Sequence, residues 1–283
     1  MSRNIKEILK TNRIAIKKRY GQNFLLDHNI LRKIADVANI DKNALVIEIG
    51  PGLGSLTDYL IQKAKHVLAY EIDKALVPIL KEHFKEAPLT LIQDDILKRD
   101  IDSDITALNQ TFDHVIVVAN LPYYITTPIL MKCLEESVKI KRMVVMMQYE
   151  VAQRITATRK TKDYNALSIS IQYRAKTELA FKVSRTVFMP PPNVDSAVVT
   201  LDFYDQPPVK LNSEKHFYQL IKAAFKQRRK TILNNLSTAY DIDKETLKEH
   251  LIACSIQPER RGETLSLEEF ANLTNYLVEQ KII

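Results

Sequence analysis

The segment from Asn120 to Tyr124 carries residue types that suit chemistry on a planar amino group. Asn120 offers a neutral amide oxygen as a hydrogen-bond acceptor. The carbonyl of Leu121 is held in extended geometry because Pro122 disfavours the helical region for the residue before it. Two acceptors fixed side by side suit an amino group, and Tyr123 adds an aromatic face on which a planar base can stack for about 1–3 kcal/mol. The alternative interpretation is a strand-end turn whose tyrosines pack in a core.

A glycine-rich loop follows an earlier apolar run, residues 44–49, and reads Gly50-Pro51-Gly52-Leu53-Gly54. It holds three of the five glycines of the chain, which argues against an ordinary strand–helix turn. Glycine has no side chain to block a ligand, so the backbone can approach one closely here. The spacing departs from Gly-x-Gly-x-x-Gly and no Gly-Lys-Ser/Thr follows, so a phosphate-cradling loop is the weaker alternative.

Acidic residues follow the next two apolar runs. Glu71 comes after residues 67–70 and is placed to accept hydrogen bonds from ribose hydroxyls, whereas Asp73 could instead cap the following helix. Asp94 and Asp95 come after residues 89–92, where a side chain or a backbone group could read the edge of an adenine ring. For this last pair, a solvated loop is the alternative interpretation.

These segments belong to an alternation of short apolar strands and helical patterns. Continuous apolar strands separated by helices predict a parallel sheet covered on both faces, which makes a doubly wound, mostly parallel α/β domain. Ligands of such sheets bind at the carboxyl ends of the strands. We expect an early helix at 30–38, capped by Asp27 or Asn29. The expected strands are 44–49, 67–70, 89–92, 114–119 and 143–147, with helices near 55–64, 74–86, 128–137 and 149–158.

The rest of the chain changes character. Strands are expected at 179–187 and 196–203, adding to the sheet in antiparallel fashion, while 166–173 fits either helix or strand. A linker at 205–208 precedes helical patterns at about 213–238, 243–254 and 266–280. We therefore expect one domain over 1–207, with a basic arm over 1–20, and a small all-helical domain over 208–283.

Composition limits the classes of protein. The 283 residues are 27% charged and 46% hydrophobic, an ordinary globular balance, and no apolar run is long enough to span a membrane. The N-terminus does not read as a signal peptide, so we expect a cytoplasmic protein. Cys133 and Cys254 are far apart without paired histidines, which argues against disulfides and a metal site. A net charge of +7 and a pI near 9.1 favour a polyanionic partner.

The order of strand-end motifs, a glycine loop, an acid, another acid and then Asn-Leu-Pro-Tyr, resembles the S-adenosylmethionine-dependent methyltransferases with a Rossmann-like fold. The last motif resembles the branch that methylates adenine N6. Five separated motifs are together similar to the bacterial small-subunit ribosomal RNA adenine dimethyltransferase family. They are Gly21-Gln22-Asn23-Phe24-Leu25, residues 48–54, residues 120–123, residues 187–199 and Arg228-Arg229-Lys230 through Leu236.

The resemblance implies S-adenosylmethionine as cofactor and two adjacent adenosines near the 3′ end of the small-subunit (16S) RNA, in the immature 30S particle, as substrate. It implies a monomer that needs no metal and takes part in ribosome biogenesis. The cofactor pocket that it implies comprises Asn23, Leu25, Gly50, Gly52, Glu71, Ile72, Asp95, Ile96 and Asn120.

Catalytic and RNA-binding residues are also expected. Asn120, Leu121, Pro122 and Tyr123 form the acceptor segment, and Phe188 is the candidate for a second stacking face, with a core position as its alternative. Basic runs usually mark solvated faces, but the run at 222–230 is predicted to lie on an amphipathic helix that presents cations to phosphates. The expected RNA-binding residues are Lys17, Lys18, Arg19, Lys226, Arg228, Arg229 and Lys230.

Three other functions stay open from the sequence. One is a large-subunit ribosomal RNA adenine methyltransferase of the antibiotic-resistance type, which shares the strand-end motifs. The motifs at 187–199 and 228–236 favour the small-subunit family instead. The others are a ribosome assembly factor without important catalysis and a DNA amino-methyltransferase.

Overall fold

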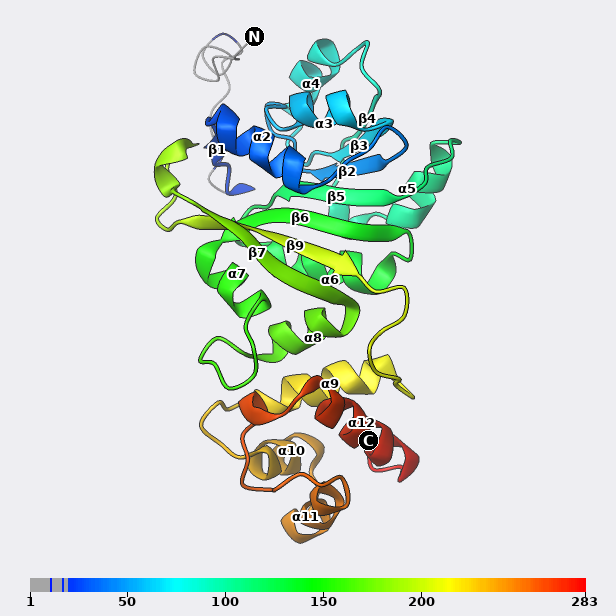
Figure 1. Ribbon diagram of the computed structural model, residues 1–283, viewed down its shortest axis with the longest axis vertical. Helices are drawn as coiled ribbons and strands as arrows, with labels where there is room; N and C mark the ends of the chain where they lie inside the picture. The colour runs from blue at the N-terminus through cyan, green and yellow to red at the C-terminus, as the bar shows by residue number, and fades with distance from the viewer. Residues whose placement is uncertain (1–10, 12–16, 18–19) are drawn as a thin grey trace. The chain divides into compact units, whose positions relative to one another are not determined.

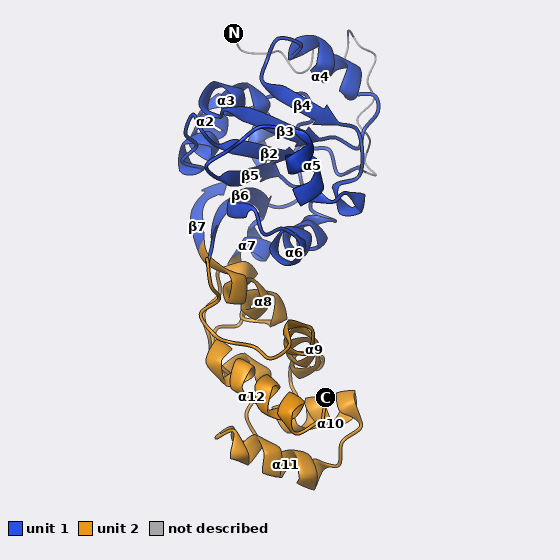
Figure 2. Ribbon diagram, turned by 90° about the vertical axis from the view of Figure 1, so that its right-hand side faces the viewer, with its two compact units in different colours: residues 1–152, 178–203 blue, residues 153–177, 204–283 orange. Residues whose placement is uncertain are grey.

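The computed structural model describes residues 11, 17 and 20–283. By their internal contacts, residues 1–152 and 178–203 form one compact unit, and residues 153–177 and 204–283 form a second (Figure 2). The first unit is built around a sheet, so we call it the sheet unit, and the second is the helical unit.

The sheet unit contains a seven-stranded sheet in the order β4-β3-β2-β5-β6-β9-β7 (Figure 1). Its first five strands run parallel, as the continuous apolar runs predicted. The expectation of a doubly wound α/β fold is therefore confirmed. The parallel strands are β2 (Leu45–Ile49), β3 (His66–Tyr70), β4 (Leu89–Ile92), β5 (Val115–Asn120) and β6 (Ile140–Gln148).

Two later strands extend the sheet. β9 (Ser196–Phe203) pairs antiparallel with β6, as expected, and β7 (Ala175–Val183) lies beside β9 at the edge. The expected strand at 179–187 is thus shifted, because Ser184 caps a 3₁₀ turn, η3 (Arg185–Val187), which ends the extended run. Two short strands, β1 (Phe24–Leu25) and β8 (Phe188–Met189), pair antiparallel and were not predicted.

Helices cover both faces of the sheet. α2 and α3 lie on one face and α5 and α6 on the other (Figure 2). The side chain of Asp27 accepts hydrogen bonds from the Asn29 and Ile30 amides, which confirms the predicted cap. α5 was missed because its sequence is largely polar, with Asp100 as its cap. The helices are α2 (His28–Val37), α3 (Thr57–Lys63), α4 (Val77–His83), α5 (Ile101–Ala107), α6 (Thr126–Glu136) and α7 (Tyr149–Ile155), with the 3₁₀ turn η2 (Ile96–Lys98).

The helical unit has a core of its own, around Phe217, Leu220 and Phe270. The segment 166–173, which fitted helix or strand, forms α8, and Tyr173 donates from its hydroxyl to Glu214 of α9 at 2.9 Å. The unit's helices are α8 (Ala166–Arg174), α9 (Glu214–Ala224), α10 (Ile232–Tyr240), α11 (Lys244–Ala253) and α12 (Leu267–Glu279), with the 3₁₀ turn η4 (Gly262–Thr264).

The prediction of a single helix over 213–238 is wrong, because the helix ends after α9 and a loop separates it from α10. Thr231 caps α10 by accepting from the Asn234 amide. The side-chain amide of Asn235 donates to the carbonyl of Ala224 at 2.8 Å, and so satisfies a carbonyl at the end of α9. The basic run 226–230 therefore lies in a loop, not on a helix face.

The compact units differ from the expected domains at two points. The helical unit resumes at residue 204 and not at 208, and it also includes residues 153–177, the last three of which begin β7. None of the helices in the described part of the chain has the length and apolar character needed to cross a membrane.

Candidate active site

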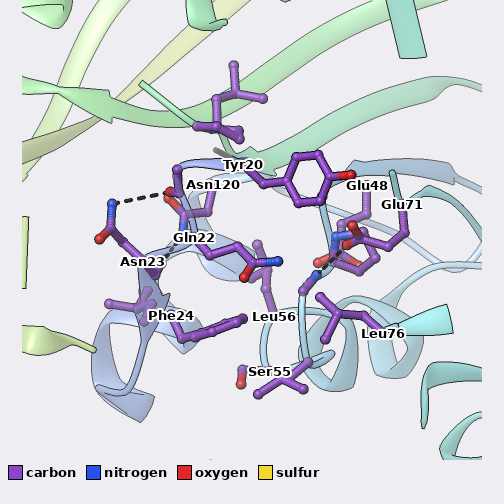
Figure 3. Close-up of a pocket in the computed structure, with 18 of the residues that line it drawn as sticks. Tyr20, Gln22, Asn23, Phe24, Glu48, Ser55, Leu56, Glu71, Leu76 and Asn120 are labelled. Carbon is purple, nitrogen blue, oxygen red and sulfur yellow. Dashed lines mark hydrogen bonds between the residues drawn. The ribbon is translucent and has the colours of Figure 1, made fainter. Parts of the chain in front are cut away.

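The register of the sheet brings three motifs to one edge. Ile49 pairs with both Tyr70 and Ala119, so the residues that follow them, Gly50, Glu71 and Asn120, leave neighbouring strands side by side. A pocket at this edge encloses about 880 Å³ of space not filled by atoms, part of it continuous with solvent (Figure 3).

The glycine loop leaves room for a ligand. Gly50 and Gly52 both have positive φ angles, +71° and +60°. A Cβ built on Gly50 would have no atom within 4 Å, so the backbone there borders open space, whereas a Cβ on Gly52 would come within 3.3 Å of the Phe24 ring. A ligand can therefore approach the main chain at Gly50 directly.

Glu71 is a buried acid held by backbone amides. Its carboxylate oxygens accept hydrogen bonds from Gly52 N–H at 3.1 Å and from Asp73 N–H at 2.8 Å. Burial raises the pKa of Glu71 to about 7. The carboxyl group lines the pocket with its position fixed from both sides, and its remaining lone pairs can accept a hydroxyl group.

The Asn120 segment presents two hydrogen-bond acceptors that receive no hydrogen bond from the described residues. The Asn120 amide nitrogen donates to the Asn23 carbonyl at 3.3 Å, while its amide oxygen receives no hydrogen bond from any described residue. The Pro122 carbonyl already accepts from Ile125 N–H at 3.2 Å and from the Thr126 hydroxyl at 3.1 Å. Among residues 11, 17 and 20–283, nothing donates to the Leu121 carbonyl. The available pair is thus the Asn120 side chain and the Leu121 carbonyl.

Residues before β1 close another side of the pocket. Asp73 is buried and accepts from the Lys17 ammonium at 2.5 Å and from the Gln22 amide at 2.8 Å. Burial alone would raise the pKa of Asp73, but these bonds hold it below its usual value. Lys17, expected on a solvated arm, therefore forms an ion pair with a buried aspartate, while its own side chain stays 32% exposed. Lys18 and Arg19 lie outside the described residues.

A family model described as ribosomal RNA adenine dimethylase matches residues 13–279. The chain belongs to the ribosomal RNA adenine dimethylase family. Proteins named ribosomal RNA small subunit methyltransferase A are similar to this chain over nearly its whole length. The Enterococcus faecalis protein is 49% identical, covering 98% of this chain and 95% of that protein, and the Geobacillus protein is 49% identical over 96% and 95%.

Solved structures agree with this fold. A dimethyladenosine transferase from Plasmodium falciparum is 26% identical to the dimethylase, with a TM-score of 0.76, covering 91% of this chain and 98% of that one. The 23S rRNA methyltransferase ErmE, at 24% identity and a TM-score of 0.68 over 90% and 100%, shows the fold alone.

The dimethylase is an S-adenosylmethionine-dependent enzyme that acts on ribosomal RNA, which confirms the predicted class and cofactor. Its pocket fits this cofactor, because the open backbone at Gly50 and the fixed Glu71 carboxyl suit a nucleoside with ribose hydroxyls. When bound, S-adenosylmethionine supplies a methyl group activated by its sulfonium.

The structure brings most of the expected site residues together. The pocket is lined by Asn23, Leu25, Gly50, Gly52, Glu71, Ile72, Asn120, Leu121, Pro122 and Tyr123. Asp95 and Ile96 follow β4 and do not line it: the Asp95 side chain accepts from Leu97 N–H, and Ile96 is buried. Phe188 is 4% exposed and packs in the core with Leu25, so its role as a stacking face stays a prediction.

Sequence reasoning also missed several lining residues. Tyr20, Gln22 and Phe24 were not predicted as site residues, yet all three line the pocket. The signal that could have found them is their clustering around Asn23, the position assigned to the cofactor. No group of side chains suited to a metal ion occurs in the described part of the dimethylase.

Glu48 predicts a pH dependence of stability. It is 1% exposed and accepts the Thr57 hydroxyl at 2.6 Å, and burial raises its pKa from 4.5 to about 8, with Glu71 and Asp58 adding to the rise. The folded protein therefore keeps this proton where the unfolded chain has lost it. Stability then falls as pH rises from about 4.5 to 8, by up to about 1.4 kcal/mol per pH unit.

Glu48→Gln keeps the acceptor for Thr57 and removes the titration. We expect the wild type to lose stability relative to this variant between pH 5 and 7.5, as measured by urea unfolding at each pH. The exposed Glu82→Gln serves as control and should follow the wild type. Parallel curves for wild type and Glu48→Gln would show that Glu48 is ionised in the folded protein.

Proposed function

We propose that the dimethylase transfers methyl groups from S-adenosylmethionine to N6 of two adjacent adenosines in the 3′-terminal hairpin of small-subunit ribosomal RNA. The observation that carries this is the pair of donor-free acceptors, the Asn120 amide oxygen and the Leu121 carbonyl, beside the Tyr123 ring. The substrate is supported by relatives named for the small subunit. We further place the reaction in the cytoplasm, on the immature 30S particle, with the enzyme as a monomer.

The chemistry of an adenine amino group explains why two acceptors are needed. Its nitrogen is a poor nucleophile because the lone pair is delocalised into the ring. Hydrogen bonds from its two N–H groups to Asn120 and Leu121 draw the nitrogen toward tetrahedral geometry and aim its lone pair at the methyl carbon. Positioning then supplies much of the acceleration, and no strong base is required.

An adenosine must leave its stack to reach these acceptors. This costs a few kcal/mol, which stacking on an aromatic side chain offsets. Tyr123 lines the pocket next to the acceptor pair and is the residue we assign to that contact.

Cations of the helical unit supply contacts to phosphates in this proposal. Lys226, Arg229 and Lys230 are exposed in the loop between α9 and α10, and no ion pair involving them is found among the described residues. Arg228 differs, since its guanidinium lies 3.0 Å from the Glu263 carboxylate.

Replacing Lys226, Arg229 and Lys230 together by alanine should weaken RNA binding and flatten its salt dependence. Each lysine or arginine that no longer binds a phosphate makes the negative slope of log K against log salt shallower by about 0.7 to 0.9. Binding to small-subunit RNA at several salt concentrations measures this. Lys215→Ala, an exposed cation of α9, is the control. An unchanged slope in the triple variant would place the RNA elsewhere.

The proposed function is tested by incubating the enzyme with labelled S-adenosylmethionine and undermethylated small subunits, then mapping the modified adenines. Two adjacent dimethylated adenosines near the 3′ end are expected. Large-subunit RNA and DNA in parallel reactions separate the other methyltransferase functions. Binding to small subunits without incorporation of label would indicate an assembly factor.

A further inference from the structure

The segment from Pro190 to Ser196 has a distinctive sequence but no part in the chemistry described so far. Its last residue contacts the acceptor side of the pocket. The Ser196 hydroxyl lies 2.6 Å from the Tyr123 hydroxyl, and Ser196 is fully buried at the first position of β9. Within the described residues, this is the one side-chain hydrogen bond of Tyr123, and it fixes the hydroxyl end of the ring.

The sheet sets the distance between these two hydroxyl groups. Ser196 pairs with Gln148, the last residue of β6, and β6 also pairs with β5, which ends at Asn120. The Leu121 amide continues that ladder by donating to the Met146 carbonyl at 3.0 Å. Ser196 and the acceptor segment are therefore attached to the same strand.

The turn before Ser196 is held by hydrogen bonds and an ion pair to residues that precede it in the chain. The Asp195 carboxylate accepts from the Lys182 ammonium at 2.8 Å and from Arg185 N–H at 3.1 Å. The Arg185 guanidinium donates in turn to the Asn193 carbonyl at 3.0 Å. These bonds fix the backbone next to Ser196, and so fix the position from which its hydroxyl group contacts another side chain.

A bond at the hydroxyl end of a tyrosine fixes the direction of the ring's long axis. Tyr123 has a partly exposed ring that lines the pocket, and only its far end is tied. Without this hydrogen bond, the Tyr123 side chain could turn to another χ1 rotamer, and its ring would no longer line the pocket beside the acceptor pair. The bond to Ser196 keeps the aromatic face where an entering base meets it.

We infer that Ser196 is a positioning residue for methyl transfer, which aims the Tyr123 ring at the target base. The inference rests on the proposed function and deepens it. Ser196 does not touch the reacting atoms, and it acts only through Tyr123. The Pro190–Ser196 segment thereby acquires a role at the site without lining the pocket.

The test compares Ser196→Ala, Tyr123→Phe and the double variant in single-turnover methylation of undermethylated small subunits. Each single variant should slow transfer about 2- to 15-fold, the equivalent of one ordinary hydrogen bond. The double variant should be no slower than the slower single one, because both changes remove the same bond. Ser196→Thr, which keeps a hydroxyl group, should recover most of the rate.

Two further measurements separate positioning from a purely structural role. Affinity for S-adenosylhomocysteine, measured by calorimetry, should stay unchanged in all these variants. Tyr240→Phe, which removes a buried hydroxyl that has no partner among the described residues, is the control for loss of a phenol group and should transfer at the wild-type rate.

Wild-type transfer rates in both Ser196→Ala and Tyr123→Phe, or additive losses in the double variant, would overturn the inference. If Ser196→Ala does not fold, Tyr123→Phe alone still decides, since a wild-type rate would overturn it too. Failure of the proposed function looks different, because the wild-type enzyme itself would then leave small-subunit adenines unmodified.

Discussion

Asn120→Ala is expected to reduce methyl transfer by about 10²- to 10³-fold, the usual cost of losing one aligned hydrogen-bonding group at a reacting centre. In this variant the target amino group keeps only the Leu121 carbonyl as an acceptor. The lone pair of its nitrogen is then no longer directed at the methyl carbon. Cofactor affinity should weaken only modestly, because the Gly50 backbone and Glu71 remain in place. Single-turnover methylation and binding of S-adenosylhomocysteine measure the two effects separately.

A matched control is Asn29→Ala. Asn29 is exposed in the first turn of α2, where only its backbone amide takes part in the cap. Wild-type transfer is expected from it. Normal turnover in Asn120→Ala would remove the acceptor mechanism, and an equal loss in both variants would point to a general effect of asparagine replacement on folding.

Glu71→Gln is expected to weaken cofactor binding by about 10- to 100-fold. The new amide nitrogen must face either the Gly52 or the Asp73 N–H, both of which now donate to the carboxyl group. One backbone donor then loses its acceptor, and hydrogen bonds to a charged group contribute about 1.5–3 kcal/mol. Calorimetric titration with S-adenosylhomocysteine gives the change in affinity.

Glu82→Gln on the exposed face of α4 is the control for Glu71→Gln. It makes the same chemical change away from the pocket and should bind with wild-type affinity. If Glu71→Gln also bound normally, the ribose assignment would have to move to another residue.

Much of the sheet could be predicted because each buried parallel strand is a continuous apolar run, as in residues 115–119. The break after Ala224 could not, because Phe225 and Ile232 are spaced by two helical turns and the polar residues between them include no glycine or proline that would end a helix. The hydrogen bond that ends α9 comes from Asn235, a residue eleven positions later. Two-residue strands such as β1 carry no period at all.

The site was predictable to the extent that it lies at strand ends. Strand order was not needed, because parallel strands deliver their last residues to one edge whatever the order. Sequence could not show that the neighbouring Pro122 carbonyl is already occupied, since this depends on hydrogen bonds from Thr126 and Ile125. It also could not reveal that Lys17 forms an ion pair with the buried Asp73.

The discontinuous helical unit has a consequence for synthesis of the chain. Tyr173 of α8 packs against Phe217 of α9, with ring centroids 5.1 Å apart. Because α8 precedes β7 and β9 in the chain and α9 follows them, α8 leaves the ribosome well before its partner. Its apolar residues Ile169 and Tyr173 therefore stay exposed to solvent while β7 and β9 are synthesised. A chain that stops at residue 207 keeps every strand of the sheet but leaves this face in water, which makes it prone to aggregation.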